Sequence, residues 1–201
     1  MGNMTLARVE TVGGISPFEV AEDPLTQRDY ELMKAAMPKW RDLLILKCLR
    51  STGVRINELL SITPQHVRSD GVGLEFLIKR GKKRHKDGAQ VIYEPVPLPP
   101  ELAVEVLAWV KGNGYRATQK IFPITDRQVR NVFAAAGLSA IGRRVHPHEL
   151  RGLYIKWLMD AGLNVSAAAK MVGHEDVRTT QKHYYKLSAD DRRRIQSEIP
   201  V

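Results

Sequence analysis

Positively charged and proton-transferring residues recur along this chain in short motifs that suit the cutting of a phosphodiester. Two arginines could bind phosphate oxygens, two imidazoles and a lysine could move protons, and a phenol could attack phosphorus. The motifs are Arg55, a lysine-rich segment at 79–86, His148-Glu149-Leu150-Arg151, Gly173-His174 and Tyr184-Tyr185. No cluster of carboxylates with metal-ligand spacing accompanies them, so the sequence predicts phosphoryl transfer to tyrosine without a metal.

Arg55 lies where one helix is expected to end and the next to begin, in Thr-Gly-Val-Arg-Ile-Asn-Glu-Leu-Leu at 52–60. An arginine among apolar neighbours needs a partner, and Glu58 stands three residues further on. One interpretation is a simple Arg55–Glu58 salt bridge. The other is a planar fork held at a helix start, where it could bind phosphate oxygens.

The segment 79–86 concentrates positive charge between two expected strands. It could be no more than a solvated hairpin tip. It could instead enter a DNA groove, where a lysine with a pKa lowered by neighbouring cations donates a proton. The candidates for DNA contact are Lys79, Arg80, Lys82, Lys83, Arg84 and Lys86.

His148 and Arg151 are one helical turn apart, so their side chains share a face at a helix N-terminus. Imidazole, guanidinium and free backbone N–H groups together predict an anion site. A histidine at such a place is otherwise a helix cap, and the pair His146 and His148 lacks the further ligands that a metal site needs.

His174 follows a glycine at a helix junction, which favours its exposure to a ligand. The phenol of Tyr184 or Tyr185 has a reference pKa of about 10, so attack at neutral pH requires cationic surroundings. The arginines and histidines of the other motifs would supply them.

Hydrophobic periodicity and helix-capping residues predict an α+β fold, mostly helical, with one small antiparallel sheet. Expected strands at 74–78 and 90–93 are joined by a long flexible connection, and Gly137 is expected to end the fifth helix. Leu150, Leu153, Trp157, Leu158 and Ala161 form one apolar face. Helices are expected at 26–37, 39–52, 57–62, 100–111, 126–136, 148–161, 166–172, 176–185 and 189–198. The expected domains are a flexible leader at 1–23, a single catalytic unit at 24–187 and a tail helix at 188–201.

The composition favours an intracellular protein that binds a polyanion. A formal net charge of +9 in 201 residues makes nucleic acid the first candidate. The single cysteine, Cys48, lies in an apolar run and is expected in the core. The sequence shows no membrane-spanning run and no signal-peptide pattern, so the expected location is the cytoplasm, on DNA.

Together, the motifs resemble the catalytic domain of the tyrosine recombinases, the phage integrase family. The segment 52–60 is similar to the family's first arginine motif, and His148-Glu149-Leu150-Arg151 matches its His-x-x-Arg box. Gly173-His174 with the tyrosine that follows matches the closing segment. The resemblance covers residues 25–187 with the motifs in the family's order, and this combination is highly specific.

The resemblance implies a role for each matching residue. Arg55 and Arg151 would bind the scissile phosphate, His148 would act as general base or acid, and His174 would hydrogen-bond the phosphate. Lys82 would be the general acid, because Arg80-Gly81-Lys82 aligns with the family's Gly-Lys hairpin. Tyr184 would form a 3′-phosphotyrosyl link, with Tyr185 as the alternative nucleophile.

Three departures from the family pattern stand out. Tyr184 follows His174 by ten residues where nine is common, and Gly152 replaces a frequent histidine. About 25 residues precede the match, too few for the N-terminal helical domain that members usually carry. We therefore expect either a fragment or a protein that works without that half.

The resulting hypothesis is a site-specific DNA recombinase of integrase, resolvase or transposon type, with no cofactor and no metal. Its expected partners are double-stranded DNA, further copies of the chain in a tetramer on DNA, and accessory DNA-bending proteins. The tail at 188–201 would contact a neighbouring subunit or pack on its own domain. Two alternatives remain, a non-catalytic DNA-binding module of this fold and a topoisomerase with the same chemistry.

Overall fold

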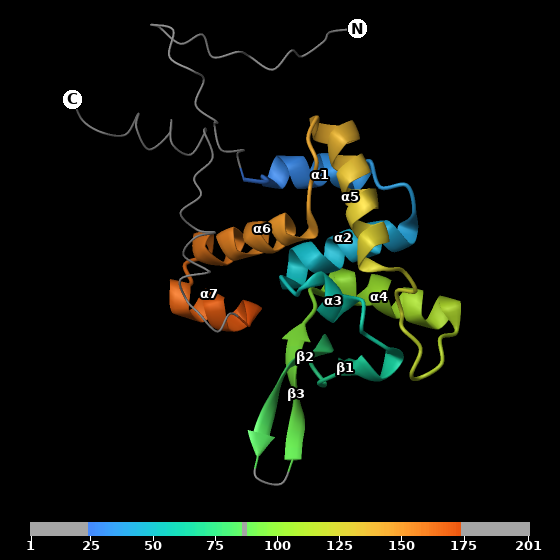
Figure 1. The fold of residues 1–201 in the computed structure, drawn as a ribbon, viewed down its shortest axis with the longest axis vertical. Helices are drawn as coiled ribbons and strands as arrows, with labels where there is room; N and C mark the ends of the chain where they lie inside the picture. The colour runs from blue at the N-terminus through green and yellow to red at the C-terminus, as the bar shows by residue number, and fades with distance from the viewer. Residues whose placement is uncertain (1–23, 86–87, 174–201) are drawn as a thin grey trace, which may run out of the picture.

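The computed structural model describes residues 24–85 and 88–173, and the side chains of 24–80 and 91–173. In this part, helices form the body of the molecule and a β-hairpin projects from it (Figure 1). The helices are α1 (Gln27–Ala35), α2 (Trp40–Thr52), α3 (Ile56–Leu59), the 3₁₀ helix η1 (Pro64–His66), α4 (Pro100–Asn113), α5 (Asp126–Ile141), α6 (Pro147–Asp160) and α7 (Val165–Val172). The strands are β1 (Val67–Ser69), β2 (Leu74–His85) and β3 (Gly88–Pro97). This architecture confirms the predicted mostly helical α+β fold.

Helix α2 lies in the middle of the core because it is apolar on most of its circumference. Leu44, Ile45, Leu46, Cys48 and Leu49 are each at most 1% exposed. Their burial confirms the prediction that the cysteine is a core residue, and it raises the pKa of the Cys48 thiol. Helix α6 packs directly against α2, which brings His148 and Arg151 next to Arg55.

The predicted capping residues set the helix starts. Thr26 Oγ1 accepts the Asp29 N–H at 3.1 Å, and Asp29 Oδ2 accepts the Thr26 N–H at 2.9 Å. Thr125 caps α5 in the same way with Gln128. No helix of the described residues is long and apolar enough to cross a membrane.

The hairpin is longer and more regular than the sequence predicted. Strands β2 and β3 pair antiparallel as far as His85 opposite Gly88, and β1 adds to the other edge of β2. The expected connection at 79–88 was therefore wrong for 79–85 and 88, which belong to the two strands. Backbone hydrogen bonds can extend a ribbon into solvent without apolar residues, so the charged extension has no period-two hydrophobic pattern that marks it as strand.

Two further expectations were corrected by tertiary packing. Helix α5 does not end at Gly137 but continues to Ile141, with Gly142 at φ +75° as its left-handed cap. Gly137 is a glycine because a Cβ there would lie 2.6 Å from the Arg143 carbonyl oxygen. In α6, Trp157 does not belong to the core face, since it is 52% exposed, while Tyr154 is buried instead.

Candidate active site

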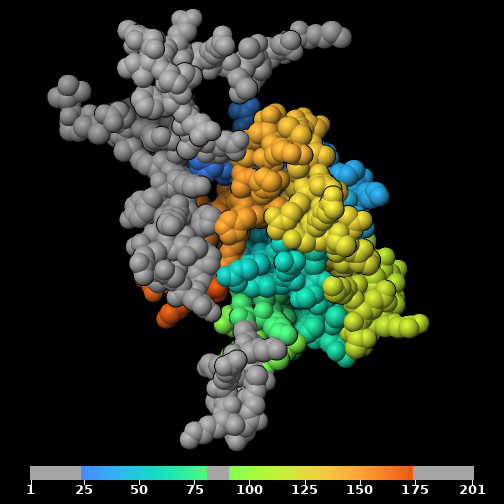
Figure 2. Space-filling model, viewed as in Figure 1, coloured from blue at the N-terminus to red at the C-terminus, as the bar shows by residue number. Residues whose placement is uncertain are grey.

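Three of the predicted site residues line one hollow of about 190 Å³. It forms where the α2–α3 junction, α5 and the start of α6 meet. Figure 2 shows this face, with the cyan surface around α3 adjoining the yellow of α5 and the orange that leads into α6. The lining residues are Val54, Arg55, Ile56, Asn57, Arg130, Pro147, His148 and Arg151.

Arg55, the residue that precedes α3, lines this hollow. Gly53 ends α2 in the left-handed conformation at φ +62°, and the chain turns so that Arg55 becomes the N-cap of the next helix. Glu58 accepts the Arg55 backbone N–H at 2.7 Å and its Nη1 at 2.9 Å. Arg55 Nη2 also lies 3.4 Å from the Gly173 carbonyl oxygen. Both interpretations of Arg55 therefore hold. Its guanidinium is paired with Glu58, and the side chain is still 49% exposed, so it remains accessible to a ligand.

Arg151 is held from behind by backbone carbonyl groups. It donates through Nη1 to the Gly53 carbonyl and through Nη2 to the Val172 carbonyl, the latter at 2.6 Å. Only 1% of the residue is exposed. Burial lowers the pKa of Arg151 to about 10, and the charge of Arg55 contributes in the same direction. Such a desolvated cation gains most from an anion that enters the hollow.

His148 lies exposed in the first turn of α6 and lines the same hollow. Pro147 opens the helix, and the Glu149 carboxylate accepts the His146 backbone N–H at 2.8 Å. The imidazole therefore stands beside Arg151 at the positive end of a helix. This arrangement offers an anion one imidazole and two guanidinium groups.

Arg130 is a lining residue that the sequence analysis missed. It projects from the first turns of α5 and forms a two-point ion pair with Asp126, at 2.7 and 3.1 Å. In the sequence, the i, i+4 spacing of these residues indicates only an ordinary ion pair on a helix surface. Its place beside the hollow depends on how α5 packs, which the sequence does not display.

The basic hairpin residues do not behave alike. Lys79 is exposed, as a DNA-contacting residue requires. Arg80 was expected to contact DNA, but its side chain is only 7% exposed and ion-paired with Glu58 at 3.0 Å. The backbone of Lys82, Lys83 and Arg84 lies in β2, and their side chains, like all of Lys86, lie outside the described part.

The predictions for His174, Tyr184 and Tyr185 also lie outside the described residues, as do the leader at 1–23 and the tail at 188–201. The structure therefore leaves the position of the nucleophile as a prediction. Among the side chains described, those of 24–80 and 91–173, no three His, Cys, Asp or Glu are arranged to hold a metal ion.

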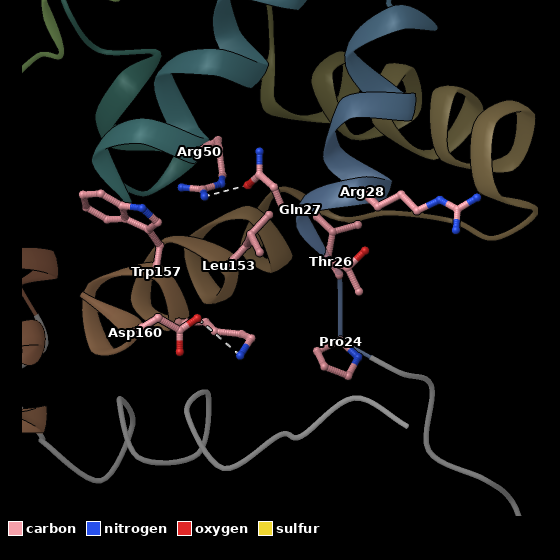
Figure 3. Close-up of a pocket in the computed structure, with 10 residues that line it drawn as sticks. Pro24, Thr26, Gln27, Arg28, Arg50, Leu153, Trp157 and Asp160 are labelled. Carbon is pink, nitrogen blue, oxygen red and sulfur yellow. Dashed lines mark hydrogen bonds and ion pairs between the residues drawn. The ribbon is translucent and has the colours of Figure 1, made fainter. Parts of the chain in front are cut away.

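A second, larger hollow of about 560 Å³ lies on another part of the surface, between the start of α1, the end of α2 and α6. Figure 3 shows Trp157 and Arg50 facing it, with Arg50 hydrogen-bonded to Gln27 at 2.8 Å. Its lining holds none of the predicted site residues.

Comparison with known proteins bears on the fold and on the family. The model of the family described as "Phage integrase family" matches residues 24–191. A tyrosine recombinase XerA from Thermococcus kodakarensis is 26% identical over 88% of this chain and 62% of its own length. A tyrosine recombinase XerC from Pseudomonas putida is 28% identical over 70% of this chain and 46% of its own length. The chain thus spans about half to three fifths of these relatives.

Solved structures show the same fold at low sequence identity. A crystal structure of XerA recombinase superposes with a TM-score of 0.67 at 18% identity, covering 94% of this chain and 68% of that one. The XerH site-specific recombinase, bound to a palindromic difH substrate in a post-cleavage complex, also gives 0.67, at 17% identity over 87% of this chain and 52% of its own.

Proposed function

The chain belongs to the phage integrase family, and from this premise we propose that it cuts and rejoins DNA as a tyrosine site-specific recombinase. The observation that carries the proposal is the convergence of Arg55, His148 and Arg151 on one hollow. Residues almost a hundred positions apart in sequence meet there, and carbonyl and carboxylate groups orient both guanidinium groups. A module that only bound DNA would have no need of this arrangement.

Charge complementarity explains what the hollow would do. A phosphodiester carries one negative charge, and attack by a phenol adds charge to its non-bridging oxygens in the transition state. Arg55 and Arg151 would bind those oxygens as planar forks. Because Arg151 is buried before substrate arrives, much of its desolvation cost is met in folding, and binding the phosphate requires little reorganisation.

The reaction would proceed by direct exchange at phosphorus. The phenolic oxygen of Tyr184, with Tyr185 as the alternative, attacks the phosphorus and forms a phosphotyrosyl bond to the 3′ strand end. The bond to the 5′ oxygen breaks, and that oxygen receives a proton to leave as a hydroxyl group. The phenol's proton passes to His148, and His174 would hydrogen-bond the phosphate. Rejoining reverses these steps with the 5′ hydroxyl of a partner strand.

The proton donor to the leaving group is proposed to be Lys82 in β2, on the resemblance to the family's hairpin. Lys82 lies in β2, and the hairpin of β2 and β3 projects from the helical body (Figure 1). Lysine suits the task, since its pKa falls among other cations. Lys79, Lys83, Arg84 and Lys86 would contact the DNA backbone.

The proposed partners follow from the chemistry of strand exchange. Each cut joins one chain to one strand end, so exchange between two duplexes needs four copies on DNA. We therefore propose a DNA-bound tetramer, with the tail at 188–201 in contact with a neighbouring copy and accessory DNA-bending proteins as further partners. Native gel electrophoresis with a bound duplex would count the copies.

A covalent adduct is the direct test. The DNA site is first identified by sequencing duplexes selected for binding to the full chain. A nicked duplex with that site is then incubated with the protein and resolved under denaturing conditions. We expect an adduct that persists in EDTA, disappears in Tyr184→Phe and remains in Tyr185→Phe.

Other outcomes identify the error. Loss of the adduct in Tyr185→Phe alone would assign the nucleophile to Tyr185. An adduct in neither the parent nor either variant would favour the non-catalytic DNA-binding alternative. A strict requirement for magnesium would refute the metal-free mechanism.

A further inference from the structure

Arg80 is the extra residue of a β-bulge in β2. The pairing register between β2 and β3 shifts between Lys79 and Gly81, so no residue of β3 lies opposite Arg80. Phe76 and Ile78, four and two positions earlier, point into the core at 0% and 1% exposure. Alternation directs Arg80 to the same side of the sheet, and the bulge places its side chain against Glu58 and Gly173.

The Arg80 guanidinium is packed between Glu58 and the turn that follows α7. Its Nη1 lies 3.2 and 3.0 Å from the two carboxylate oxygens of Glu58. Its Nε lies 3.3 Å from a Glu94 oxygen, without the geometry of a hydrogen bond. A Cβ on Gly173, which has φ +68°, would lie 2.8 Å from Arg80 Cζ, so the guanidinium lies directly against that backbone.

The cost of this placement indicates a role beyond packing. Arg80 Nε and Nη2 are buried without a hydrogen-bond partner among the described residues. Buried donors without partners are expensive and are kept where the surroundings require the group. The charge of Arg80 also acts on its neighbours, since it lowers the pKa of Arg151 after the larger effects of burial and Arg55.

The charge balance of the cluster shows what Arg80 contributes. The Glu58 carboxylate binds Arg55 at 2.9 Å and Arg80 at 3.0 Å. With Arg151, these groups are three cations and one largely buried anion, an excess of two positive charges, and the half-exposed Glu94 carboxylate at 3.3 Å from Arg80 Nε offsets part of that excess. Without Arg80, Glu58 would neutralise Arg55, and the excess would fall to one. Because the transition state is more negative than the ground state, the loss of positive charge would slow cleavage more than it weakens binding.

We propose that Arg80 is a positioning residue for the cleavage reaction. It balances the charge of Glu58, so that the cluster keeps its positive excess for the phosphate, and its guanidinium supports the Gly173 turn. The inference rests on the proposed recombinase function. It assigns to the bulged arginine, which does not itself line the hollow, a role in the charge balance around Arg55 in place of the expected contact with DNA.

The test compares cleavage with binding in Arg80→Met, Glu58→Gln and the double variant. Single-turnover adduct formation is followed on the nicked duplex, and affinity is measured by fluorescence anisotropy on the intact one. We expect Arg80→Met to cleave about 100-fold more slowly with affinity nearly unchanged. Adding Glu58→Gln removes the unbalanced carboxylate, so the double variant is expected to cleave about tenfold faster than Arg80→Met. Arg80→Lys, which keeps the charge, is expected to lose less than Arg80→Met.

Arg68→Met is the matched control. Arg68 is an arginine of the same sheet whose Nε binds the buried Glu75 at 2.8 Å, and it does not line the hollow. Its loss should cost stability without slowing cleavage. If Arg80→Met melts well below this control, Arg80→Gln replaces it in the comparison. The expected order is the same: the parent cleaves fastest, then the double variant with Glu58→Gln, then the single Arg80 variant.

The outcomes separate this inference from the proposed function. If the parent chain forms no adduct, the recombinase proposal fails. If the parent forms it and Arg80→Met is equally fast, the inference is overturned. It is also overturned if the double variant is no faster than Arg80→Met, since a purely structural role would not respond to the charge of Glu58.

Discussion

Replacing Gly53 by alanine tests how the fold holds Arg151. Gly53 ends α2 with φ +62°, and its carbonyl oxygen accepts a hydrogen bond from Arg151. An alanine Cβ there would lie 2.3 Å from Cδ1 of Tyr154 and 3.1 Å from Val172. Tyr154 is only 7% exposed, so its ring has little room to move away.

The expected cost has two parts. A left-handed backbone costs an alanine roughly 1 kcal/mol, partly offset by the lower entropy of its unfolded chain. Forcing a methyl group against a buried ring adds about 1–3 kcal/mol. We therefore expect Gly53→Ala to lower the free energy of unfolding by about 3 kcal/mol, or the melting temperature by about 9 °C.

Gly142→Ala provides the matched comparison, because Gly142 also has positive φ, at +75°, but nothing lies within 4 Å of its Cβ position. It should lose about 1 kcal/mol, the strain alone. Urea denaturation of both variants measures the difference, which isolates the clash. Adduct formation should slow in Gly53→Ala only, since the displaced carbonyl no longer orients Arg151.

Equal destabilisation of the two variants, within about 0.5 kcal/mol, would refute this reasoning, since that is the usual limit of additivity between independent sites. It would mean that Tyr154 yields without cost. A further check places Tyr154→Leu in the Gly53→Ala background, where the smaller side chain should recover part of the lost stability.

Three other predictions follow from the described contacts. Arg151→Lys should slow adduct formation about 100-fold in a single-turnover assay, because a single ammonium nitrogen cannot span the positions that the two guanidinium Nη atoms reach at the Gly53 and Val172 carbonyls while also binding phosphate. Gly137→Ala should destabilise the protein in urea despite alanine's helix propensity, because its Cβ would lie 2.8 Å from Val145 Cγ2. Burial raises the pKa of Tyr30 to about 12, so the folded state holds its proton longer than the unfolded state. Stability should therefore fall by about 2 kcal/mol between pH 10 and 12, and Tyr30→Phe should lack that fall in pH-dependent denaturation.

The local elements of this fold were largely predictable from the sequence. Thr26 and Thr125 begin helices and Gly53 ends one, because each satisfies backbone groups within a few residues of itself. The apolar sequence of α2 likewise predicted a buried helix. Gly137 shows the limit, since its neighbours in space rather than in sequence forbid a side chain.

By itself, the sequence determined the family and the residue types of the site, because short motifs carry their chemistry in their spacing. Tertiary structure decided the rest. Arg80 belongs to the cluster because a bulge turns it there. Arg151 is a buried cation because α6 packs against α2 and brings it to the Gly53 and Val172 carbonyl groups. Both facts depend on which surfaces meet, and charge pairing and desolvation are fixed only when distant segments come together.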